Sequence, residues 1–273
     1  MTNYRFLFPV SPFNSKVPDD AFADEMRLLM EANIACSLWH GNDVYSWKMT
    51  PPILPGEVVV CRGWMMRVSE YQEFAHWVGH TNASMLSSVE GYARCHLLPG
   101  WYSAISDLTA PTIILPDSPD LVAMISGLGQ NWPGYFVKDY VKSLTTKRGS
   151  IAQSPEEALD ILQLLKQYRG SLEGGACLRR LESFVANSER RYFVIKGTPY
   201  AAEGDVPDIV SVCAKRIQAP FFSVDVAELT SGSLQIVEIG DGQVSDTKHW
   251  DTEKFVKTLL EALAIPPTVP VME

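Results

Sequence analysis

The sequence lacks three features that would each indicate a particular class of protein. No apolar run approaches the ~20 residues that a membrane-spanning helix needs. The N-terminal stretch from Met1 to Val10 is too short and too polar at its flanks for a signal peptide. None of the five cysteines forms a CxxC pair, so neither a zinc knuckle nor a disulfide frame is indicated. We therefore expect reduced, buried thiols in a cytoplasmic protein that has no membrane partner.

Basic charge is also scarce. The chain carries 23 Lys and Arg against 32 Asp and Glu, which gives a formal net charge of −9. A protein that binds nucleic acid non-specifically needs a basic surface to meet the phosphates, so we expect no nucleic-acid partner. The 273 residues are 46% hydrophobic and 20% charged, which is typical of a globular protein of one or two domains.

The first part of the chain, residues 1–116, predicts an α/β domain. Short apolar strands alternate there with helical patterns, and this alternation is typical of a parallel sheet. A capping box from Ser69 to Gln72 predicts the start of a helix. The apolar face of the first helix is expected to contain Phe22, Met26, Leu29 and Met30. The other predicted elements are strands at Arg5–Val10, Ile34–Trp39 and Glu57–Cys61, and a helix at Asp19–Ala32.

The pattern changes after a junction at about Pro116–Pro133, and residues 117–273 predict an α+β domain with an antiparallel sheet. Ser154, Pro155 and Glu157 form a strong helix start, and that helix is expected to end near Tyr168. Short turns join several strand candidates, which favours antiparallel pairing. The expected strands are Gly134–Lys138, Ala176–Phe184, Arg190–Lys196, Ile209–Ala214, Phe221–Leu229 and Leu234–Ile239, and a last helix follows from Asp251, its N-cap, to Ala264.

Three acids near the end of this domain are candidate metal ligands. Asp225 lies in a β-branched strand, Glu238 ends the next strand, and Asp241 follows just after it. Two carboxylates that meet on one face of adjacent strands repel each other unless a cation lies between them. Oxygen ligands suit magnesium, which takes one or two protein carboxylates together with nucleotide phosphates. The alternative is that Asp225 is a satisfied polar residue and Glu238 a solvated strand end.

A basic segment, YFVKDYVKSLTTKRGS, is a candidate phosphate site. Lys138 ends a strand, Lys142 lies four residues further on, and Lys147 and Arg148 lie in a loop of small residues before a helix. Phosphoryl transfer needs cations over the nucleotide oxygens, and small residues let the backbone close over them. The segment is not a Walker P-loop, because GxxxxGK[ST] is absent. The alternative is a solvated basic turn.

Other charged residues leave two interpretations open. Arg62 follows the EVVVC strand. Its planar guanidinium could bind a substrate carboxylate at this end of the sheet or form a structural ion pair. His76 and His80 have the i, i+4 spacing of a metal pair, but the glutamate of HExxH is missing. Core or surface histidines are the alternative there.

Taken in order, the segments of residues 134–245 resemble the ATP-grasp superfamily. There a strand lysine, as in FVK, precedes a phosphate-covering loop and a hinge that ends in an acid, as in RRLESF. An arginine-led strand, as in ERRYFVIKG, then precedes the metal pair, as in SVDVAEL and IVEIGDGQVS. The first domain resembles the Rossmann-like domain that precedes the grasp. The segments CRGWMM, VKDYVKS and VEIGDGQVS resemble a clade named for its arginine and paired lysines, common in phages and bacteria.

The resemblance implies a role for each matching residue. Lys138 and Lys147 would contact nucleotide phosphate, Lys142 would be the extra lysine of the clade, and Arg191 would contact the terminal phosphate or the acyl phosphate. The implied metal ligands are Asp225 and Glu238. Many members have Asn two residues after the metal glutamate, and Gly240 stands there, so either Asp241 replaces that ligand or the second metal is bound differently. The implied adenosine site consists of Leu181, Glu182, which would meet the ribose, Ser183 and Phe184.

The activity that the resemblance implies is ligation at the expense of ATP with Mg²⁺. A carboxylate of a small molecule or peptide would attack the terminal phosphate of ATP, and an amine or thiol would capture the acyl phosphate. Two alternatives remain. One is a phosphotransferase on the same fold, and the other is a nucleotide-binding module without turnover.

Overall fold

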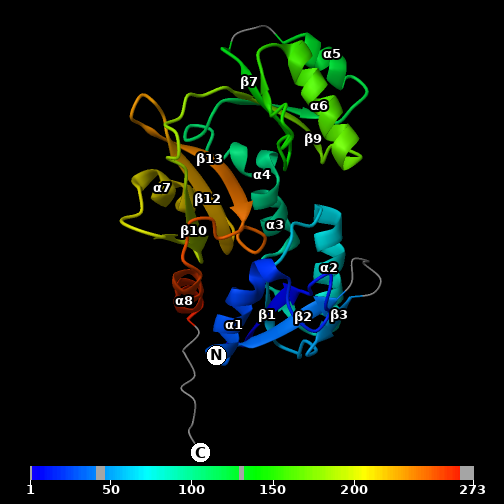
Figure 1. Ribbon diagram of the computed structural model, residues 1–273, viewed down its shortest axis with the longest axis vertical. Helices are drawn as coiled ribbons and strands as arrows, with labels where there is room; N and C mark the ends of the chain where they lie inside the picture. Colours follow the sequence, from blue (N-terminus) through cyan, green and yellow to red (C-terminus); the bar gives the residue numbers. More distant parts are fainter. Residues whose placement is uncertain (1, 41–46, 129–131, 265–273) are drawn as a thin grey trace, which may run out of the picture. The chain divides into compact units, whose positions relative to one another are not determined.

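The computed structural model describes residues 2–40, 47–128 and 132–264 (Figure 1). The chain forms two compact units, each assembled from separate stretches of sequence. The first contains Met1–Ala93, Arg191–Val224 and Gly240–Glu273, and the second contains Arg94–Arg190 and Asp225–Ile239. The two domains predicted from the sequence, residues 1–116 and 117–273, are continuous stretches, and that division stays a prediction.

A five-stranded sheet lies in the first unit. Its elements in chain order are β1 (Tyr4–Pro9), η1 (Asp20–Phe22), α1 (Ala23–Glu31), β2 (Ala35–His40), β3 (Lys48–Thr50), β4 (Val58–Cys61), α2 (Val68–His80) and β5 (Ser84–Met85). The strand order is β3-β2-β1-β4-β5. Strand β1 runs parallel to β2 and β4, β4 runs parallel to β5, and β3 pairs antiparallel with β2. The parallel sheet expected from alternating strands and helices is thus present.

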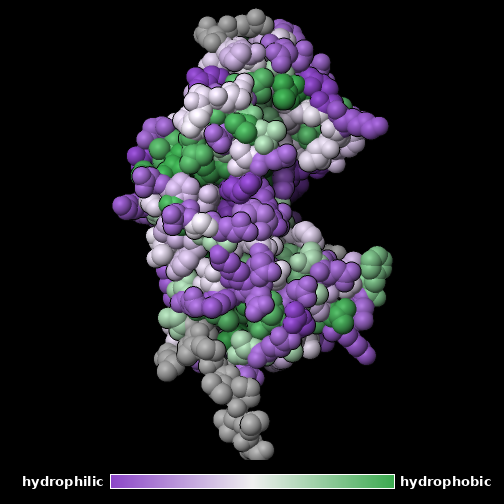
Figure 2. Space-filling model, turned by 60° about the vertical axis from the view of Figure 1, so that its left-hand side comes forward, coloured by the Kyte–Doolittle hydropathy of each residue, from purple (hydrophilic) through white to green (hydrophobic). Residues whose placement is uncertain are grey.

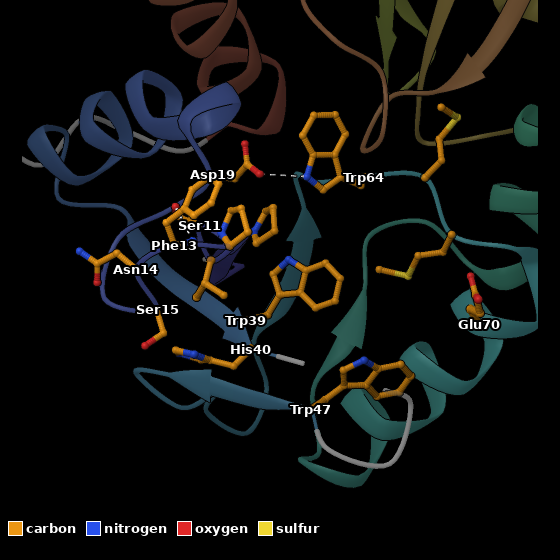
Figure 3. Close-up of a pocket in the computed structure, with 15 residues that line it drawn as sticks. Ser11, Phe13, Asn14, Ser15, Asp19, Trp39, His40, Trp47, Trp64 and Glu70 are labelled. Atoms are coloured by element: carbon orange, nitrogen blue, oxygen red, sulfur yellow. Dashed lines mark hydrogen bonds between the residues drawn. The ribbon is translucent and has the colours of Figure 1, made fainter. Parts of the chain in front are cut away.

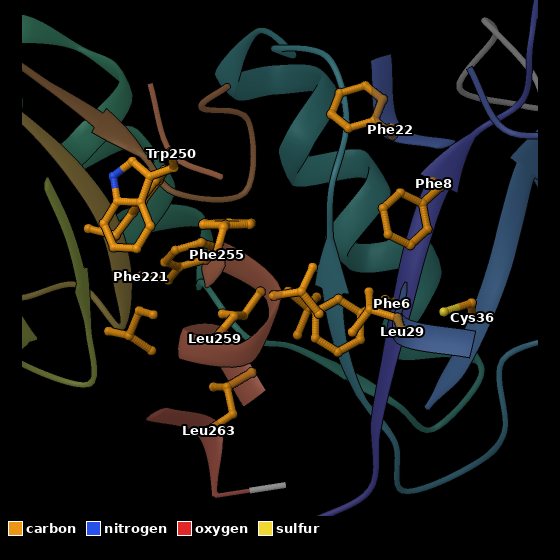
Figure 4. Packing of buried hydrophobic residues seen from close by; sticks show 14 of the residues in the cluster. Phe6, Phe8, Phe22, Leu29, Cys36, Phe221, Trp250, Phe255, Leu259 and Leu263 are labelled. Atoms are coloured by element: carbon orange, nitrogen blue, oxygen red, sulfur yellow. The ribbon is translucent and has the colours of Figure 1, made fainter. Parts of the chain in front are cut away.

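Strand β1 anchors the core of this unit (Figure 4). Phe6 and Phe8 point to one face of the sheet and Leu7 to the other, and all three are 0% exposed. A strand covered on both faces reads as a continuous apolar run, which explains the sequence FLF at residues 6–8. On the Phe6 face, helix α8 (Thr252–Leu263) contributes Phe255 to the same cluster.

The second unit contains an antiparallel sheet in the order β6-β9-β7-β8. Its core joins Val137 and Leu178 of the sheet to Ile161 and Leu165 of α6, and α5 and α6 lie over one face (Figure 1). The predicted start of α6 is confirmed, since Ser154 Oγ accepts a hydrogen bond from Glu157 N at 3.3 Å. The elements are β6 (Thr112–Pro116), α5 (Leu121–Ser126), β7 (Tyr135–Asp139), β8 (Ile151–Ala152), α6 (Pro155–Arg169) and β9 (Gly175–Arg180), preceded by α3 (Val89–His96) and α4 (Leu98–Tyr102).

A third sheet has the order β11-β10-β12-β13. Its strands are β10 (Arg190–Ile195), β11 (Thr198–Ala201), β12 (Phe221–Glu228) and β13 (Leu234–Asp241). The boundary between the two compact units falls within β12 and within β13. The sequence predicts both of these strands, and they carry the three candidate metal acids.

Helix α7 (Asp208–Arg216) corrects the prediction of a strand at Ile209–Ala214. The buried positions Val210, Cys213 and Ala214 follow the i, i+3, i+4 spacing of one helix face. A short apolar run does not separate a buried strand from a buried helix segment, and the β-branched residues favoured the wrong alternative.

Two smaller predictions in the first unit are wrong. Helix α2 begins at Val68 rather than after a Ser69 cap, and the Glu70 carboxylate accepts a hydrogen bond from Arg67 N at 2.8 Å. Met30 was expected on the apolar face of α1 but is 56% exposed. The start and the N-cap Asp251 of helix α8 are as predicted, with Asp251 Oδ1 accepting from Lys254 N at 2.9 Å.

The surface mixes polar and apolar side chains. On the face that Figure 2 shows, hydrophilic side chains predominate and apolar ones form separate patches. Phe13 and Trp64 are among the large exposed apolar residues, at 96% and 54% exposure. Within the described residues, no helix combines the length and the apolar character that crossing a membrane requires.

All five cysteines are buried thiols, as the sequence predicts. Burial raises the pKa of the Cys61 thiol to about 12, with Asp241 adding to the effect and Arg62 opposing it. Burial likewise raises the pKa of Cys36, Cys177 and Cys213 to about 12. The reactive thiolate is therefore scarce at neutral pH.

We expect native protein at about pH 8 to resist iodoacetamide, because all five thiols are buried and burial raises the pKa of four of them. Mass spectrometry should find less than about one adduct per native chain, and five after unfolding in urea. Rapid modification of a native cysteine would contradict the burial of that residue.

Candidate functional site

Lys138 lies at the centre of the candidate site in the second unit. Strand β7 pairs with β9 so that Lys138 lies opposite Cys177, and Phe136 lies opposite Arg179. Directly opposed residues and residues two apart share one face of an antiparallel pair. The register therefore places Lys138 and Arg179 on the same face of the sheet.

The Lys138 ammonium meets the carboxylate of Glu238. Its Nζ donates to Glu238 Oε1 at 2.7 Å, across 100 residues of sequence. Lys138 is buried, at 5% exposure, whereas the side chain of Glu238 is 43% exposed. The pair thus joins a buried cation to an anion that solvent still reaches.

The pKa of Glu238 reflects three charged neighbours. Burial by itself raises the pKa of this carboxyl, but the charge and hydrogen bond of Lys138 outweigh it, so the pKa lies below its usual value. Asp225 raises the pKa through repulsion, and Arg179 lowers it. The structure therefore brings Lys138, Asp225 and Glu238 together, and their roles as phosphate lysine and metal pair stay predictions.

Arg179 is a member of this cluster that the sequence analysis missed. Its Nη1 donates to Val237 O at 2.6 Å, and its Nη2 donates to Thr109 Oγ1 at 2.7 Å. Its Nε is buried and has no hydrogen-bond partner within the described residues. Burial lowers the pKa of this guanidinium, and Glu238 opposes that effect. The only signal in the sequence was its place in the segment CLRRLESF, two residues from Cys177.

The turn after Lys138 is organised by Asp139. Asp139 is fully buried, and its Oδ1 accepts hydrogen bonds from Val141 N and Lys142 N at 2.7 and 2.5 Å. Its Oδ2 accepts from Arg169 Nη1 at 2.6 Å. Lys142 is thereby fixed at a partly buried position close to Lys138 along the chain.

The predicted phosphate loop continues with exposed cations. Lys147 is exposed. Arg148 donates to Ile151 O at 2.8 Å and to Glu157 Oε2 at 3.2 Å, so it supports the loop rather than pointing freely into solvent. The structure thus leaves Lys147 accessible to a ligand.

The predicted adenosine segment is held by its backbone. Leu181 N donates to Gly134 O at 3.0 Å, and Ser183 O accepts from Thr230 N at 2.9 Å. A Cβ at Gly134 would lie 3.0 Å from Ala152 O and 3.1 Å from Leu181 Cδ2, so glycine permits this close approach.

Side chains in this segment remain partly accessible. Glu182 accepts from Arg180 Nε at 2.7 Å, and its side chain is 15% exposed. Phe184 is 38% exposed. A backbone edge next to an acid and an exposed ring suits a nucleoside.

Two predicted residues belong to the first unit. Arg191 Nη1 donates to Asp246 Oδ1 at 2.6 Å, and its carbonyl accepts from Trp250 Nε1 at 2.9 Å. Asp241 is buried, and its Oδ1 accepts from Gln243 N at 3.0 Å. Their predicted roles stay predictions.

Arg62 forms a structural ion pair, one of the two interpretations that the sequence left open. It is 0% exposed, and its Nε and Nη2 donate to the two carboxylate oxygens of Glu25 at 2.7 and 2.8 Å. Its Nη1 donates to the carbonyls of Gly242, Gln243 and Ser245 at 2.5 to 3.1 Å. All three guanidinium nitrogens donate hydrogen bonds to other residues of the first unit. This favours the structural ion pair over contact with a substrate.

His76 and His80 touch each other on the exposed side of α2, with their Nε2 atoms 3.0 Å apart. Across the described residues, no group of three or more His, Cys, Asp or Glu side chains could hold a metal ion. Asp225 and Glu238 interact electrostatically, and the predicted role of these two acids and of Asp241 as metal ligands stays a prediction.

Comparison with known protein families finds one family model that matches the central part of the chain. The matching model is described as an ATP-grasp domain, the third family of one clade of such domains, and it matches residues 103–259, more than half of the sequence. This stretch contains the whole Lys138–Glu238 cluster. No curated protein matches the chain.

Solved structures resemble the whole chain in fold. The D-cycloserine synthetase DcsG has a TM-score of 0.64 at 14% identity, covering 95% of this chain and 99% of that one. D-alanyl-alanine synthetase A from Vibrio cholerae has a TM-score of 0.64 at 12% identity, covering 97% and 99%. The ATP-grasp ligase PsnB, complexed with a minimal precursor, has a TM-score of 0.56 at 10% identity, covering 96% and 99%. The predicted fold class, a Rossmann-like domain followed by an ATP-grasp fold, is confirmed.

Proposed function

Because the chain belongs to the family of ATP-grasp domains whose model it matches, we propose that it is an ATP- and Mg²⁺-dependent ligase that joins a carboxylate to an amine. One observation carries the proposal beyond the family: Lys138, Arg179, Asp225 and Glu238 bring two cations and two acids together inside the matched region. A phosphate-binding site needs the cations, and a magnesium site needs the acids. We also propose that this family is the clade with an arginine and paired lysines that the sequence resembles.

The residues present fit MgATP. Asp225 and Glu238 are oxygen donors of the kind that Mg²⁺ prefers. Arg179 has a buried Nε without a partner in the described chain, and such a donor is satisfied by an anionic oxygen. Lys147 is an exposed cation on the loop next to the cluster. Leu181, Glu182, Ser183 and Phe184 would hold the nucleoside.

The chain contributes charge and positioning to the reaction. Lys138 and Arg179 would neutralise phosphate oxygens, while Lys142 and Arg191 are candidates for contacts with the group being transferred. A carboxylate oxygen forms a bond to the terminal phosphorus as the bond to ADP breaks. The amine nitrogen then attacks the acyl carbon, phosphate leaves, and the nitrogen loses a proton. Mg²⁺ would balance the negative charge of the phosphates, and Asp241 is a candidate further ligand.

The substrate class is a small molecule or a peptide. Relatives in fold are named as a D-cycloserine synthetase, a D-alanyl-alanine synthetase and a ligase complexed with a precursor. These names cover both small molecules and a peptide-like precursor, so the proposed substrate class includes both. The buried thiols support a cytoplasmic location.

Release of ADP should depend on two co-substrates. We expect purified protein with ATP and Mg²⁺ to release ADP only when an acid and an amine are supplied together, measured by coupled assay over panels of amino acids and peptides. ADP release with the acid alone would instead indicate a phosphotransferase, and a thiol in place of the amine would indicate thioester formation. ATP binding without ADP release in any combination would indicate a nucleotide-binding module. Failure to bind ATP at millimolar concentration would overturn the proposal.

A further inference from the structure

A cavity of about 790 Å³ opens at one edge of the parallel sheet of the first unit (Figure 3). Its walls include Pro9 at the end of β1, Trp39 and His40 at the end of β2, and Trp64 just after β4. Because these three strands are parallel, their carboxyl ends share one edge. Ligands of open α/β sheets bind beyond this edge, and the volume is within the usual range of small-molecule sites.

Tryptophan side chains form the walls of this cavity. In the view of Figure 3, the Trp39 ring lies between those of Trp47 and Trp64. Trp39 and Trp47 both pack against the fully buried Phe74 of α2, with ring centroids 5.8 and 5.1 Å away. Trp64 packs edge-on against Phe22 at 5.3 Å. The aromatic walls are therefore fixed by the core and need little ordering when a ligand binds.

The charge that lines the cavity has one sign. Asp19 and Glu70 contribute carboxylates, and the lining residues include no lysine or arginine within the described part of the chain. Asp19 Oδ2 accepts from Trp64 Nε1 at 3.3 Å, and Glu70 Oε2 accepts from Arg67 N at 2.8 Å. These bonds hold the carboxylates in place while each oxygen keeps further acceptor capacity. Aromatic faces and carboxylates both attract an ammonium group.

Two polar atoms of the lining side chains lack a hydrogen-bond partner within the described residues. These atoms, Trp39 Nε1 and His40 Nε2, are both buried. The indole N–H is a donor only, so it requires an acceptor such as a carbonyl oxygen. A buried donor without a partner costs free energy, which a ligand that supplies the acceptor recovers.

We propose that this aromatic cavity binds an amine that carries an apolar body and a nearby carbonyl, as in the amino end of a peptide or an amino-acid amide. The ammonium lies with the Asp19 carboxylate and the tryptophan rings, and the carbonyl accepts from Trp39 Nε1. The inference rests on the proposed function in one respect, because it makes this molecule the amine substrate of the ligase. Binding itself is independent of ATP.

Calorimetric titration of the full chain tests the cavity with three matched compounds. Phenylalaninamide has the amine, the carbonyl and an apolar ring, hydrocinnamamide lacks only the amine, and phenethylamine lacks the carboxamide. At about pH 6.5, where an α-amino group is mostly protonated, phenylalaninamide should bind roughly tenfold or more tightly than either of the others. Equal binding of hydrocinnamamide, or no binding of phenylalaninamide at millimolar concentration, would overturn the proposal.

Variants assign the binding to these residues. Asp19→Asn removes the charge but keeps one acceptor oxygen, and it should weaken both amines without affecting hydrocinnamamide. Trp39→Phe keeps an aromatic ring and should weaken phenylalaninamide to the level of phenethylamine. Glu73→Gln on α2 is the matched control, because Glu73 is exposed and does not line this cavity. Unchanged affinity in both cavity variants would place the ligand elsewhere and refute the assignment.

Turnover separates this inference from the proposed function. If phenylalaninamide binds as described while ADP release never requires an amine, the ligase proposal fails and the cavity site stands. If ADP release requires an amine, but Asp19→Asn leaves the KM for that amine unchanged, the cavity is not the substrate site and the ligase proposal stands.

Discussion

Replacing Glu238 by Gln, or Asp225 by Asn, is expected to reduce Mg²⁺-dependent ADP release by roughly 100- to 1,000-fold. Each change removes one negative charge from the pair of acids while keeping the size of the side chain. The pair is needed because Lys138 and Arg179 supply positive charge for phosphate, whereas Mg²⁺ requires anionic oxygen. A coupled ADP assay over a range of Mg²⁺ concentrations measures the loss.

Glu228→Gln is the matched control for these variants. Glu228 lies on β12 with Asp225, but it is exposed, and its place three residues further along the strand puts it on the opposite face. Its substitution should leave ADP release unchanged, and circular dichroism should confirm that all three variants fold. Turnover that persists in both Glu238→Gln and Asp225→Asn would remove these acids from the proposed site.

Structural features that depend only on residues close together in the sequence were predictable. Helix α6 carries its own start signal at Ser154 and Glu157, and both atoms of that hydrogen bond lie within one turn. The segment Ile209–Ala214 carries no such signal, since a six-residue apolar run fits a strand or a helix face. The tertiary packing of Val210 and Cys213 selects the helix there.

The residues of the candidate site also fall into two groups, those that the sequence indicated and those that only the folded structure brings to the site. The grouping of Lys138, Asp225 and Glu238 was predictable because each stands at a recognisable place in a strand, and because their order along the chain resembles a known family; their roles stay predictions. Arg179 was not, because its significance depends on the register of β7 and β9 and on contacts with residues about 60 positions away. The aromatic cavity also has no local signature, since its tryptophans come from separate segments of the first unit.

The role of Arg62 also depends on partners that are distant in sequence. Its buried ion pair leads to the second large expected effect. The partner Glu25 lies 37 residues earlier and the carbonyl partners about 180 residues later, so the sequence left substrate contact and ion pair equally open. The guanidinium also lies over the ring of Phe255, 4.9 Å from its centroid. This one side chain therefore ties α1, the end of β4 and the segment after β13 within the first unit.

Glu25→Gln is expected to lower the free energy of unfolding by about 3–5 kcal/mol, because it leaves the buried Arg62 charge without its carboxylate. Urea denaturation followed by circular dichroism measures this change as a lower midpoint. The control is Glu31→Gln on the same helix, which removes an exposed pair with Arg27 and should cost less than about 0.5 kcal/mol. A loss at Glu25 no larger than the loss at Glu31 would mean that the carboxylate does not stabilise the guanidinium, and the assignment of Arg62 to a purely structural role would then fail.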